Sequence, residues 1–235
     1  MIISEKTIFI KYGNKKLMKN IPRIFTGENI KSGDVIVASR EVSHYLTHVM
    51  RTNNCLVFGG GNEFSAVLSD DGKSIIVGDK TAHPDPSNNI TLYFAPIKRT
   101  DDLINMATQM GIARFQPVIT ERTVNNHVNW ERMKKIAIEA SEQSNRNSVP
   151  EIFAPIPFAK LNLTGLCFAD ERFAYYDRNG TNIPNTDGIL VGPEGGFSDK
   201  EFTALDAAGA IPVSLGKTIL RAEVAAVVAI AKIRK

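Results

Sequence analysis

The chain has 235 residues, 43% of them hydrophobic, which suffices for one large or two small cores and argues against intrinsic disorder. Residues 1–16 lack a signal-peptide pattern, and the apolar stretch 222–231 contains Glu223 and is about half the length needed to cross a bilayer, so we expect a cytoplasmic protein without a membrane segment. The net charge is only +3, but residues 1–60 hold nine Lys and Arg against four Asp and Glu, which fits a nucleic-acid-binding face and ordinary solvated charge equally well.

The first part of the chain has the pattern of short strands joined by turns. Four strand patterns are present, at 35–37, 55–58, 64–68 and 74–77. A helix interrupts them, and its apolar face is formed by Val42, Leu46, Val49 and Met50. These elements predict a small β barrel. The polar segment 83–89 contains two prolines and predicts a domain boundary, so we expect three parts: an N-terminal extension at 1–20, which we expect to be poorly ordered, a β-barrel domain at 21–88 and a second domain at 89–235.

Strands and helices alternate beyond that boundary. The strand patterns lie at 90–95, 115–119, 165–169, 188–191 and 211–215. Helices are predicted at 100–110, at 130–145, after Ser198 and at the end of the chain. This alternation is typical of an α/β domain, in which a mostly parallel sheet is covered by helices on both faces.

The most informative segment is a glycine-rich loop between a strand and a helix, Gly192-Pro193-Glu194-Gly195-Gly196-Phe197-Ser198. Ser198 and Glu201 have the spacing of a capping box, and Phe197 with Phe202 can form a hydrophobic staple. The glycines let the backbone approach a ligand closely, at the carboxyl end of a strand where open α/β sheets bind ligands. A tight turn with a purely structural role is the alternative.

Other kinds of site find little support in the sequence. The loop has no Lys after Gly196, which a phosphate-binding P-loop requires, and the triple glycine 59–61 is not followed by a dinucleotide-type helix. Cys55 and Cys167 lie far apart without a nearby His cluster, so we expect two reduced thiols and no metal.

A second strand–glycine–helix segment follows near the end of the chain, Leu215-Gly216-Lys217-Thr218-Ile219-Leu220-Arg221-Ala222-Glu223-Val224-Ala225. Together the two segments resemble the signature of the RsmE family of ribosomal small-subunit RNA uridine N3-methyltransferases, which belongs to the SPOUT superfamily. Both loops occur in the family's order and spacing. Val224 stands where the family usually has Thr, which removes a hydroxyl group that could cap the last helix or contact a cofactor.

The resemblance extends over most of the chain, through residues 21–25, 44–51 and 139–150. It implies a PUA-like β barrel followed by a trefoil-knotted, parallel-sheet SPOUT domain that binds S-adenosylmethionine (SAM) and forms a homodimer through the knot. The implied substrate is 16S ribosomal RNA in the small ribosomal subunit. The implied cofactor-binding residues lie on three loops and are Phe168, Gly192, Pro193, Glu194, Gly195, Gly196, Leu215, Gly216, Ile219 and Leu220.

The reaction implied by the family needs a group that stabilises the anion of uracil N3, because the protonated nitrogen is a poor nucleophile. A nearby arginine can do so by charge and hydrogen bonding. Arg221 is the first candidate, with pairing to Glu194 or Glu223 as its structural alternative, and Arg23 is the second candidate. Glu194 is a third catalytic candidate, which could accept the N3 proton or only orient its loop.

We expect RNA contacts from basic and polar side chains outside the two loops, with a surface salt bridge as the alternative for Arg40, Arg51, Arg122 and Arg146. The residues expected to contact RNA are Arg23, Arg40, His44, Arg51, Arg122, Gln143 and Arg146. Two other functions stay open. One is a SPOUT methyltransferase that acts on transfer RNA, against which the barrel and the motifs outside the knot argue. The other is a non-catalytic RNA-binding ribosome-assembly factor, against which the intact glycines argue.

Overall fold

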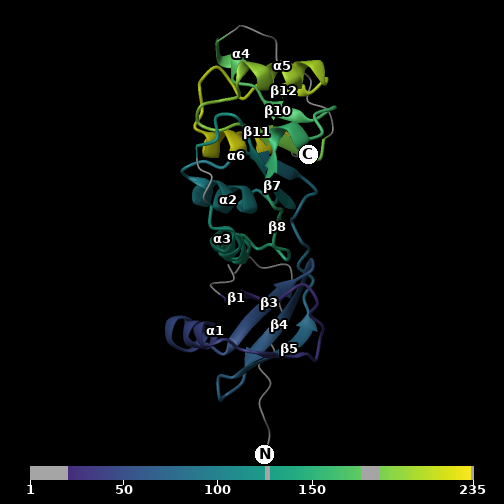
Figure 1. Ribbon diagram of the computed structural model, residues 1–235. Coiled ribbons are helices and arrows are strands. Elements are labelled where there is room, and N and C mark those ends of the chain that lie inside the picture. Colours follow the sequence, from purple (N-terminus) through teal and green to yellow (C-terminus); the bar gives the residue numbers. More distant parts are fainter. Residues whose placement is uncertain (1–20, 125–127, 176–185, 234–235) are drawn as a thin grey trace, which may run out of the picture.

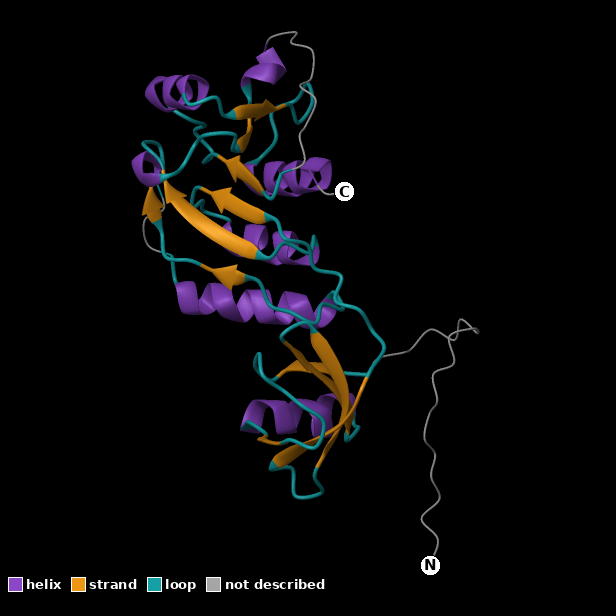
Figure 2. Ribbon diagram, turned by 90° about the vertical axis from the view of Figure 1, so that its right-hand side faces the viewer, coloured by secondary structure: helices purple, strands orange, loops and turns teal. Residues whose placement is uncertain are grey.

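The computed structural model describes residues 21–124, 128–175 and 186–233, so the expected extension at 1–20 lies outside the described residues. Two separate sheets lie at opposite ends of an elongated molecule (Figure 1). The chain passes from the first sheet to the second between Lys80 and Thr91. A view turned by 90° shows that few segments connect the two parts (Figure 2).

The N-terminal sheet has five strands in the order β1-β3-β4-β5-β2. Their bounds are β1 Arg23–Phe25, β2 Val35–Val37, β3 Asn54–Gly59, β4 Asn62–Leu68 and β5 Ser74–Lys80. β1 pairs with β3 in parallel, and the other pairs are antiparallel. Gly72, with φ +70°, adopts the left-handed conformation that the turn before β5 requires. The sequence pattern indicated four of these five strands and missed β1.

The helix of the N-terminal part differs from the prediction. It begins as α1, Arg40–His44, and continues as a π-helix, Tyr45–Met50. Leu46 is fully buried in the core beneath the sheet, but Val49 is 61% exposed, so the single apolar face expected for this segment is wrong. The physical reason is the wider turn of a π-helix, which rotates later side chains away from an α-helical stripe.

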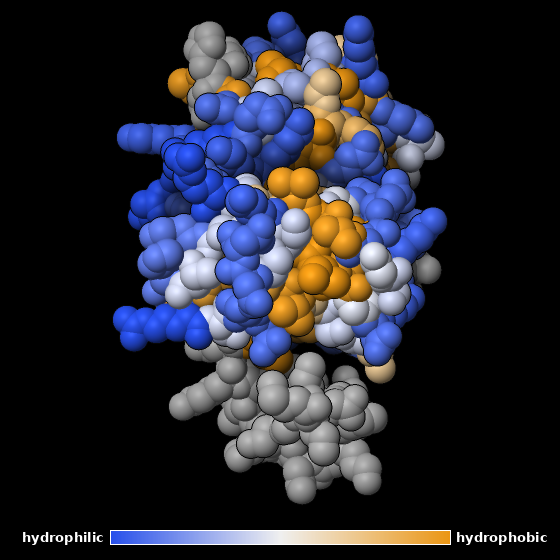
Figure 3. Space-filling model, turned by 90° about the horizontal axis from the view of Figure 1, so that it is seen from below, coloured by the Kyte–Doolittle hydropathy of each residue, from blue (hydrophilic) through white to orange (hydrophobic). Residues whose placement is uncertain are grey.

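The outer surface of this sheet carries exposed apolar side chains. Ile76 lies between Val35 of β2 and Val67 of β4, and all three are exposed. A hydrophobic patch is visible when the molecule is seen from this end (Figure 3).

The second sheet confirms the predicted parallel α/β arrangement. Its strand order is β12-β10-β11-β6-β7-β8, with β9 beside β7, and all its strand pairs are parallel. The strands are β6 Thr91–Phe94, β7 Arg114–Ile119, β8 Glu151–Ile152, β9 Ile156–Pro157, β10 Cys167–Ala169, β11 Gly188–Val191 and β12 Ile211–Val213. Because the strands are parallel, their carboxyl ends meet at one edge.

Helices cover both faces of this sheet. The helices are α2 Thr100–Gln109, α3 Trp130–Gln143, α4 Arg172–Tyr175, α5 Asp199–Ala207 and α6 Ala222–Ile233, with a short 3-10 helix at Phe158–Lys160. Neighbouring strand residues point to opposite faces. Accordingly, Cys167 and Ile189 pack in the core of α2, α3 and α6, whereas Phe168 and Leu190 pack in the core beneath α5.

The start of α5 confirms the predicted capping box. Ser198 Oγ accepts a hydrogen bond from the Glu201 amide at 3.3 Å, and Glu201 Oε2 accepts one from the Ser198 amide at 2.9 Å. The rings of Phe197 and Phe202 lie 5.6 Å apart and form the staple. These contacts fix the direction in which the chain leaves the glycine-rich loop.

Loss of the cap should lower the stability of the protein. We expect Ser198→Ala to reduce the free energy of unfolding by about 1 kcal/mol, because the Glu201 amide at the helix start loses its side-chain acceptor. Urea denaturation followed by circular dichroism measures this change. Lys200→Ala, an exposed substitution in the same helix, is the control and should change stability by less than about 0.5 kcal/mol. Equal stability of the Ser198 and Lys200 variants would contradict the role of the cap.

Candidate functional site

A cavity of about 520 Å³ lies at the carboxyl edge of the parallel sheet. Its walls come from the segments after four strands, because all four strands end at the same edge. The lining residues, at the end of each strand or after it, are Lys98 and Arg99 for β6, Ala169, Asp170, Glu171 and Ala174 for β10, Val191, Gly192, Pro193 and Glu194 for β11, and Leu215, Gly216, Thr218, Ile219, Leu220, Arg221, Ala222, Glu223 and Ala225 for β12. The position and the volume are those of a small-molecule site in an open α/β sheet.

The loop after β11 lines the cavity with its first half only. Gly192, Pro193 and Glu194 line the cavity, whereas Gly195 and Gly196 do not, and contact of the first three with SAM stays a prediction. The carbonyl of Gly195 accepts a hydrogen bond from Arg122 Nη1 at 2.8 Å. Gly195 and Gly196 therefore support the conformation of the loop from the side that faces away from the cavity.

Gly196 occupies a position that no other residue fits without displacement. Its φ is +66°, and its amide donates to the Pro193 carbonyl at 2.9 Å, which closes the turn. A Cβ atom at Gly196 would lie 2.0 Å from Oε1 of Glu171, a lining residue of the cavity. Burial, together with the nearby charge of Asp170, raises the pKa of the Glu171 carboxyl.

The loop after β12 supplies the apolar wall. Leu215, Gly216, Ile219 and Leu220 all line the cavity, and Gly216 has a φ of +123°. Their contact with SAM stays a prediction. Phe168 does not line it. This side chain is fully buried among Leu190, Phe197 and Phe202 on the α5 face of the sheet, which corrects its prediction as a cofactor contact. The next residue of β10, Ala169, reaches the cavity instead.

The charge of Arg221 is available at the rim of the cavity. Its side chain is exposed, and it forms no hydrogen bond or ion pair with the residues that the structure describes. The expected alternative partners have other contacts. Glu194 Oε1 accepts a hydrogen bond from the Lys98 amide at 3.0 Å, and buried Glu223 lies 3.8 Å from Arg99. The contact from Lys98 also gives Glu194 a role in orienting its loop.

Three charged lining residues were missed by the sequence reasoning, namely Lys98, Arg99 and Glu171, whereas Asp170 belongs to the first of the three loops that the family resemblance implied. Each follows directly after a strand or within a few residues of one, at the carboxyl edge. Open α/β sheets bind ligands at the carboxyl ends of their strands, and this rule, applied to every strand and not only to the one before residues 192–196, predicts these residues as well.

The structure contradicts the expected RNA contacts of Arg23 and Arg146. Arg23 is 9% exposed and Arg146 is 1% exposed, and the guanidinium groups of both are hydrogen-bonded inside the protein. Burial lowers the pKa of Arg146 to about 10. Neither side chain can reach RNA or a substrate base in this arrangement, which also corrects the prediction of Arg23 as a catalytic candidate.

The other residues expected to bind RNA are exposed. Arg40, His44 and Arg51 surround the helix of the N-terminal part, and the rings of His44 and His48 stack 4.7 Å apart. Gln143 lies at the end of α3, and Arg122 holds the glycine loop while its side chain stays exposed. Their contacts with RNA stay predictions.

The described ranges lack a metal-binding cluster and a membrane-spanning helix. In these ranges no group of three or more His, Cys, Asp or Glu side chains could hold a metal ion. No helix there has the length and apolar composition needed to span a membrane.

Comparison with known proteins identifies the family. The model of an RNA methyltransferase domain matches residues 83–234. Ribosomal RNA small subunit methyltransferase E of Rickettsia conorii is 35% identical over 230 residues, which cover 90% of this chain and 94% of that protein. The protein of the same name from Synechocystis is 33% identical, over 81% of this chain and 69% of its own length. A crystal structure of ribosomal RNA small subunit methyltransferase E from Neisseria gonorrhoeae, bound to S-adenosyl methionine, aligns with a TM-score of 0.78 and 27% identity, over 92% of this chain and 97% of that one. The chain therefore belongs to the ribosomal RNA small subunit methyltransferase E family.

Proposed function

We propose that this protein transfers a methyl group from SAM to N3 of a uridine in the 16S ribosomal RNA of the small subunit. The names of its relatives and the SAM-bound neighbour support the activity and the cofactor. The observation that carries the proposal is the cavity at the carboxyl edge of the sheet, which has glycine-containing loops on two sides and, at its rim, an arginine without a partner in the part of the chain that the structure describes.

The residues of the cavity fit the chemical character of SAM. Apolar side chains from Leu215, Ile219 and Leu220 can cover an adenine ring, and the acidic groups of Asp170 and Glu171 suit a ligand with cationic sulfonium and ammonium groups. The backbone at residues 192–194 and 215–220 would hold the cofactor at close range. When bound, SAM supplies an electrophilic methyl group on a positively charged sulfur.

Arg221 is the residue that we assign to the uracil base. Its unpaired guanidinium can stabilise negative charge on the uracil ring and so favour loss of the N3 proton. Binding in the cavity also orients the base, and orientation of two reactants can lower a barrier by roughly 7 kcal/mol or more in favourable cases. Arg99 is a second cation at the same rim, although it lies 3.6 Å from Asp102 and 3.8 Å from Glu223.

We also propose that residues 21–88 form a PUA-like barrel domain that docks RNA and that residues 89–235 form a SPOUT domain with a trefoil knot. The five-stranded sheet with exposed Arg40 and Arg51 supports the first assignment. The second finds support in the path of the last segment. β12 lies at the edge of the sheet, whereas the helix that follows it, α6, packs against β6 and β11 in the middle. Residues 214–221 therefore run from the edge of the sheet back to its middle, beside the loop after β11.

The final helix supports a homodimer through the SPOUT domain. Val224 is 41% exposed and Ala231 is exposed, so an apolar stripe of α6 lacks a cover within the described chain, and Ile219 in the loop before α6 is 57% exposed. A hollow between α2 and the start of α6 lies beside this stripe and is lined by Met106, Ile219, Leu220 and Val224, among others. A second copy of the chain would bury these side chains.

Dimer formation predicts a mass of two chains in light scattering at micromolar concentration. Val224→Glu should place a charge in the buried interface and shift the protein toward the monomer. Val35→Glu, on the exposed outer surface of the N-terminal sheet, is the control and should leave the dimer intact. A monomeric wild-type protein at micromolar concentration would contradict the proposal.

Mass spectrometry of ribosomal RNA from a deletion strain tests the function in the cell. Loss of one methylated uridine from 16S ribosomal RNA, restored by the wild-type gene, is the expected result. Unchanged ribosomal RNA with a lost modification in transfer RNA would favour the transfer-RNA alternative. Defective subunit assembly with no lost modification would favour a non-catalytic assembly factor. We place the protein in the cytoplasm because its proposed substrate is the ribosomal subunit.

A further inference from the structure

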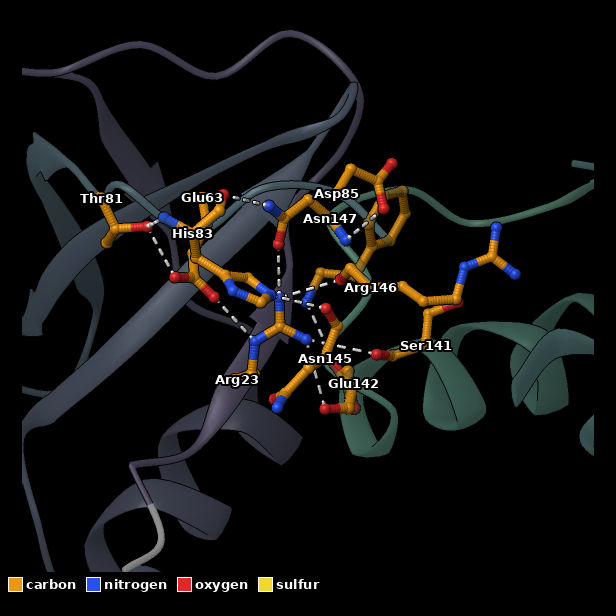
Figure 4. A network of polar contacts seen from close by, with 11 residues as sticks. Arg23, Glu63, Thr81, His83, Asp85, Ser141, Glu142, Asn145, Arg146 and Asn147 are labelled. Carbon is orange, nitrogen blue, oxygen red and sulfur yellow. Dashed lines mark hydrogen bonds and ion pairs between the residues drawn. The ribbon is translucent and has the colours of Figure 1, made fainter. Parts of the chain in front are cut away.

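The contact between the N-terminal sheet and the parallel domain is built around one buried arginine (Figure 4). We call this contact the Arg23 network, and it consists of Arg23, Glu63, Thr81, His83, Asp85, Ser141, Glu142, Asn145, Arg146 and Asn147. Its members come from β1, from β4, from the segment between the two sheets and from the end of α3 with the turn that follows. All five N–H groups of a guanidinium can donate, and here Arg23 has five hydrogen bonds.

Arg23 faces both parts of the molecule at once. On the side of the N-terminal sheet, its Nε donates to Glu63 Oε2 at 2.9 Å and its guanidinium lies over the ring of Phe58, 4.5 Å from the centroid. On the other side, Nη2 donates to the carbonyl of Arg146 at 2.9 Å and to Asn147 Oδ1 at 2.7 Å.

The remaining donor group of Arg23 caps a helix. Nη1 donates to the carbonyls of Ser141 and Glu142, at 3.3 and 3.4 Å, in the last turn of α3. The last carbonyls of a helix lack partners within it and lie at the negative end of its dipole, so a cation is favourable there. Arg23 thereby joins β1 directly to the C-terminus of α3.

The turn that Arg23 contacts is itself fixed to the parallel domain. Arg146 is 1% exposed, and its guanidinium donates to the carbonyls of Thr108 and Ile112 at 2.8 and 2.7 Å. Both carbonyls belong to the end of α2 and the segment after it. The orientation of the turn is thus set by the interior of the parallel domain, and Arg23 transmits that orientation to the N-terminal sheet.

Neighbouring contacts strengthen the same connection. The Asn147 side-chain amide donates to the His83 carbonyl at 3.0 Å, and the Gly61 amide donates to the Asn147 carbonyl at 3.0 Å. Glu142 Oε1 accepts from the Phe25 amide at 3.0 Å. Every one of these contacts crosses from one part of the chain to the other, or to the segment that joins the parts.

We propose that Arg23 is a positioning residue that fixes the direction in which the N-terminal sheet presents its RNA-docking surface to the cavity. This inference rests on the proposed function, in which Arg40 and Arg51 hold RNA while its target uridine enters the cavity. Small rotations at the contact are magnified along the elongated molecule (Figure 2). Loss of the network should therefore raise the KM for RNA and leave the SAM site unchanged.

The first test measures the arrangement of the two parts without any use of activity. Spin labels at Asp70→Cys and Lys200→Cys, both exposed and at opposite ends of the molecule, report the distance between them by pulsed electron paramagnetic resonance. Cys55 and Cys167 are buried, and burial raises the pKa of Cys55 to about 11, so neither competes for the label at neutral pH. Dilution with unlabelled protein suppresses distances between protomers. A narrow distance distribution is expected for the wild type and a broad one for Arg23→Lys and Glu63→Gln.

The second test separates positioning from direct RNA contact by kinetics. Lysine keeps the charge of Arg23 but cannot place five N–H groups in one plane, so Arg23→Lys should not rescue the network. Glu63→Gln removes a negative charge, which by itself would strengthen RNA binding. For both variants we expect the KM for small subunits to rise by about tenfold or more, as the loss of a charge-assisted hydrogen bond predicts. The Kd for SAM, measured by calorimetry, should stay within about twofold of the wild-type value, which is a change of less than about 0.5 kcal/mol in binding free energy.

Lys73→Gln, which removes an exposed charge from the turn between β4 and β5, outside the network, is the matched control. Its distance distribution should match the wild type. Three results would overturn the proposal: a narrow distribution in both network variants, full rescue by Arg23→Lys, or a lower KM for Glu63→Gln. Thermal melting shows whether each variant folds. If either Arg23→Lys or Glu63→Gln fails to fold, the distance distribution and the KM of the other variant test the proposal. If the wild type methylates no RNA, the proposed function fails, but the distance measurement still shows whether Arg23 fixes the two parts.

Discussion

Arg221→Ala should lower the single-turnover rate of methylation by about 10²- to 10³-fold, the usual cost of removing one group that stabilises charge in a transition state. Its exposed guanidinium lies at the rim of the cavity without a partner among the described residues, so truncation leaves no described buried group unsatisfied. SAM affinity should stay nearly intact, because the interaction with the uracil anion is made only as the methyl group is transferred. Higher pH should partly rescue the variant, since hydroxide then removes the N3 proton without help from the protein.

The measurement is single-turnover methylation of small subunits at saturating SAM, over a series of pH values. Lys217→Ala is the matched control, because Lys217 is exposed, belongs to the same loop and does not line the cavity. Its rate should follow that of the wild type. An Arg221→Ala rate equal to that of Lys217→Ala at every pH would show that Arg221 has no part in the chemical step.

Gly196→Val should weaken SAM binding by more than about tenfold, equivalent to at least 1.4 kcal/mol. The new Cβ would lie 2.0 Å from Oε1 and 2.7 Å from Cδ of Glu171, so the carboxylate must leave its place in the cavity wall. The side chain would also strain a backbone with φ +66°. Isothermal titration calorimetry measures the affinity, and circular dichroism checks that the sheet remains folded.

Gly209→Val separates backbone strain from crowding of the cavity. Gly209 has a φ of +70°, but nothing lies within 4 Å of the position of its Cβ. The two variants should therefore lose similar stability, while only Gly196→Val loses SAM affinity. Equal SAM affinity in Gly196→Val and Gly209→Val would argue against a cofactor at this cavity wall.

Local patterns predicted the parts of the fold that depend on neighbouring residues. The capping box of Ser198 and Glu201 and the staple of Phe197 and Phe202 depend on residues within one or two helical turns, and both are present. The alternation of strands and helices likewise predicted a parallel sheet. The strand-end rule predicted a ligand at the loop after β11, whereas only the family resemblance implied that the loop after β12 lies beside it, and both loops line one cavity.

The misassigned residues depend on contacts that span long distances in the sequence. The partners of Arg23 lie 40 to 124 positions away, and those of Arg146 include carbonyls 34 and 38 positions away. The local sequence around an arginine is the same whether its side chain binds RNA or caps a helix inside the protein. The sequence therefore favoured RNA contacts for both Arg23 and Arg146. Phe168 was misassigned for a related reason. The face to which a strand residue points depends on the layer beneath it, here the core under α5.

The most direct test of the central claim uses purified protein, SAM labelled in its methyl group, and small ribosomal subunits from a strain that lacks this enzyme. The RNA is digested to nucleosides after the reaction, and the labelled nucleoside is identified by mass spectrometry. We expect the label in 3-methyluridine from 16S ribosomal RNA, and none when the cavity variant Gly196→Val replaces the wild type. Label in another nucleoside, label only in added transfer RNA, or no transfer by a protein that binds SAM would contradict the claim.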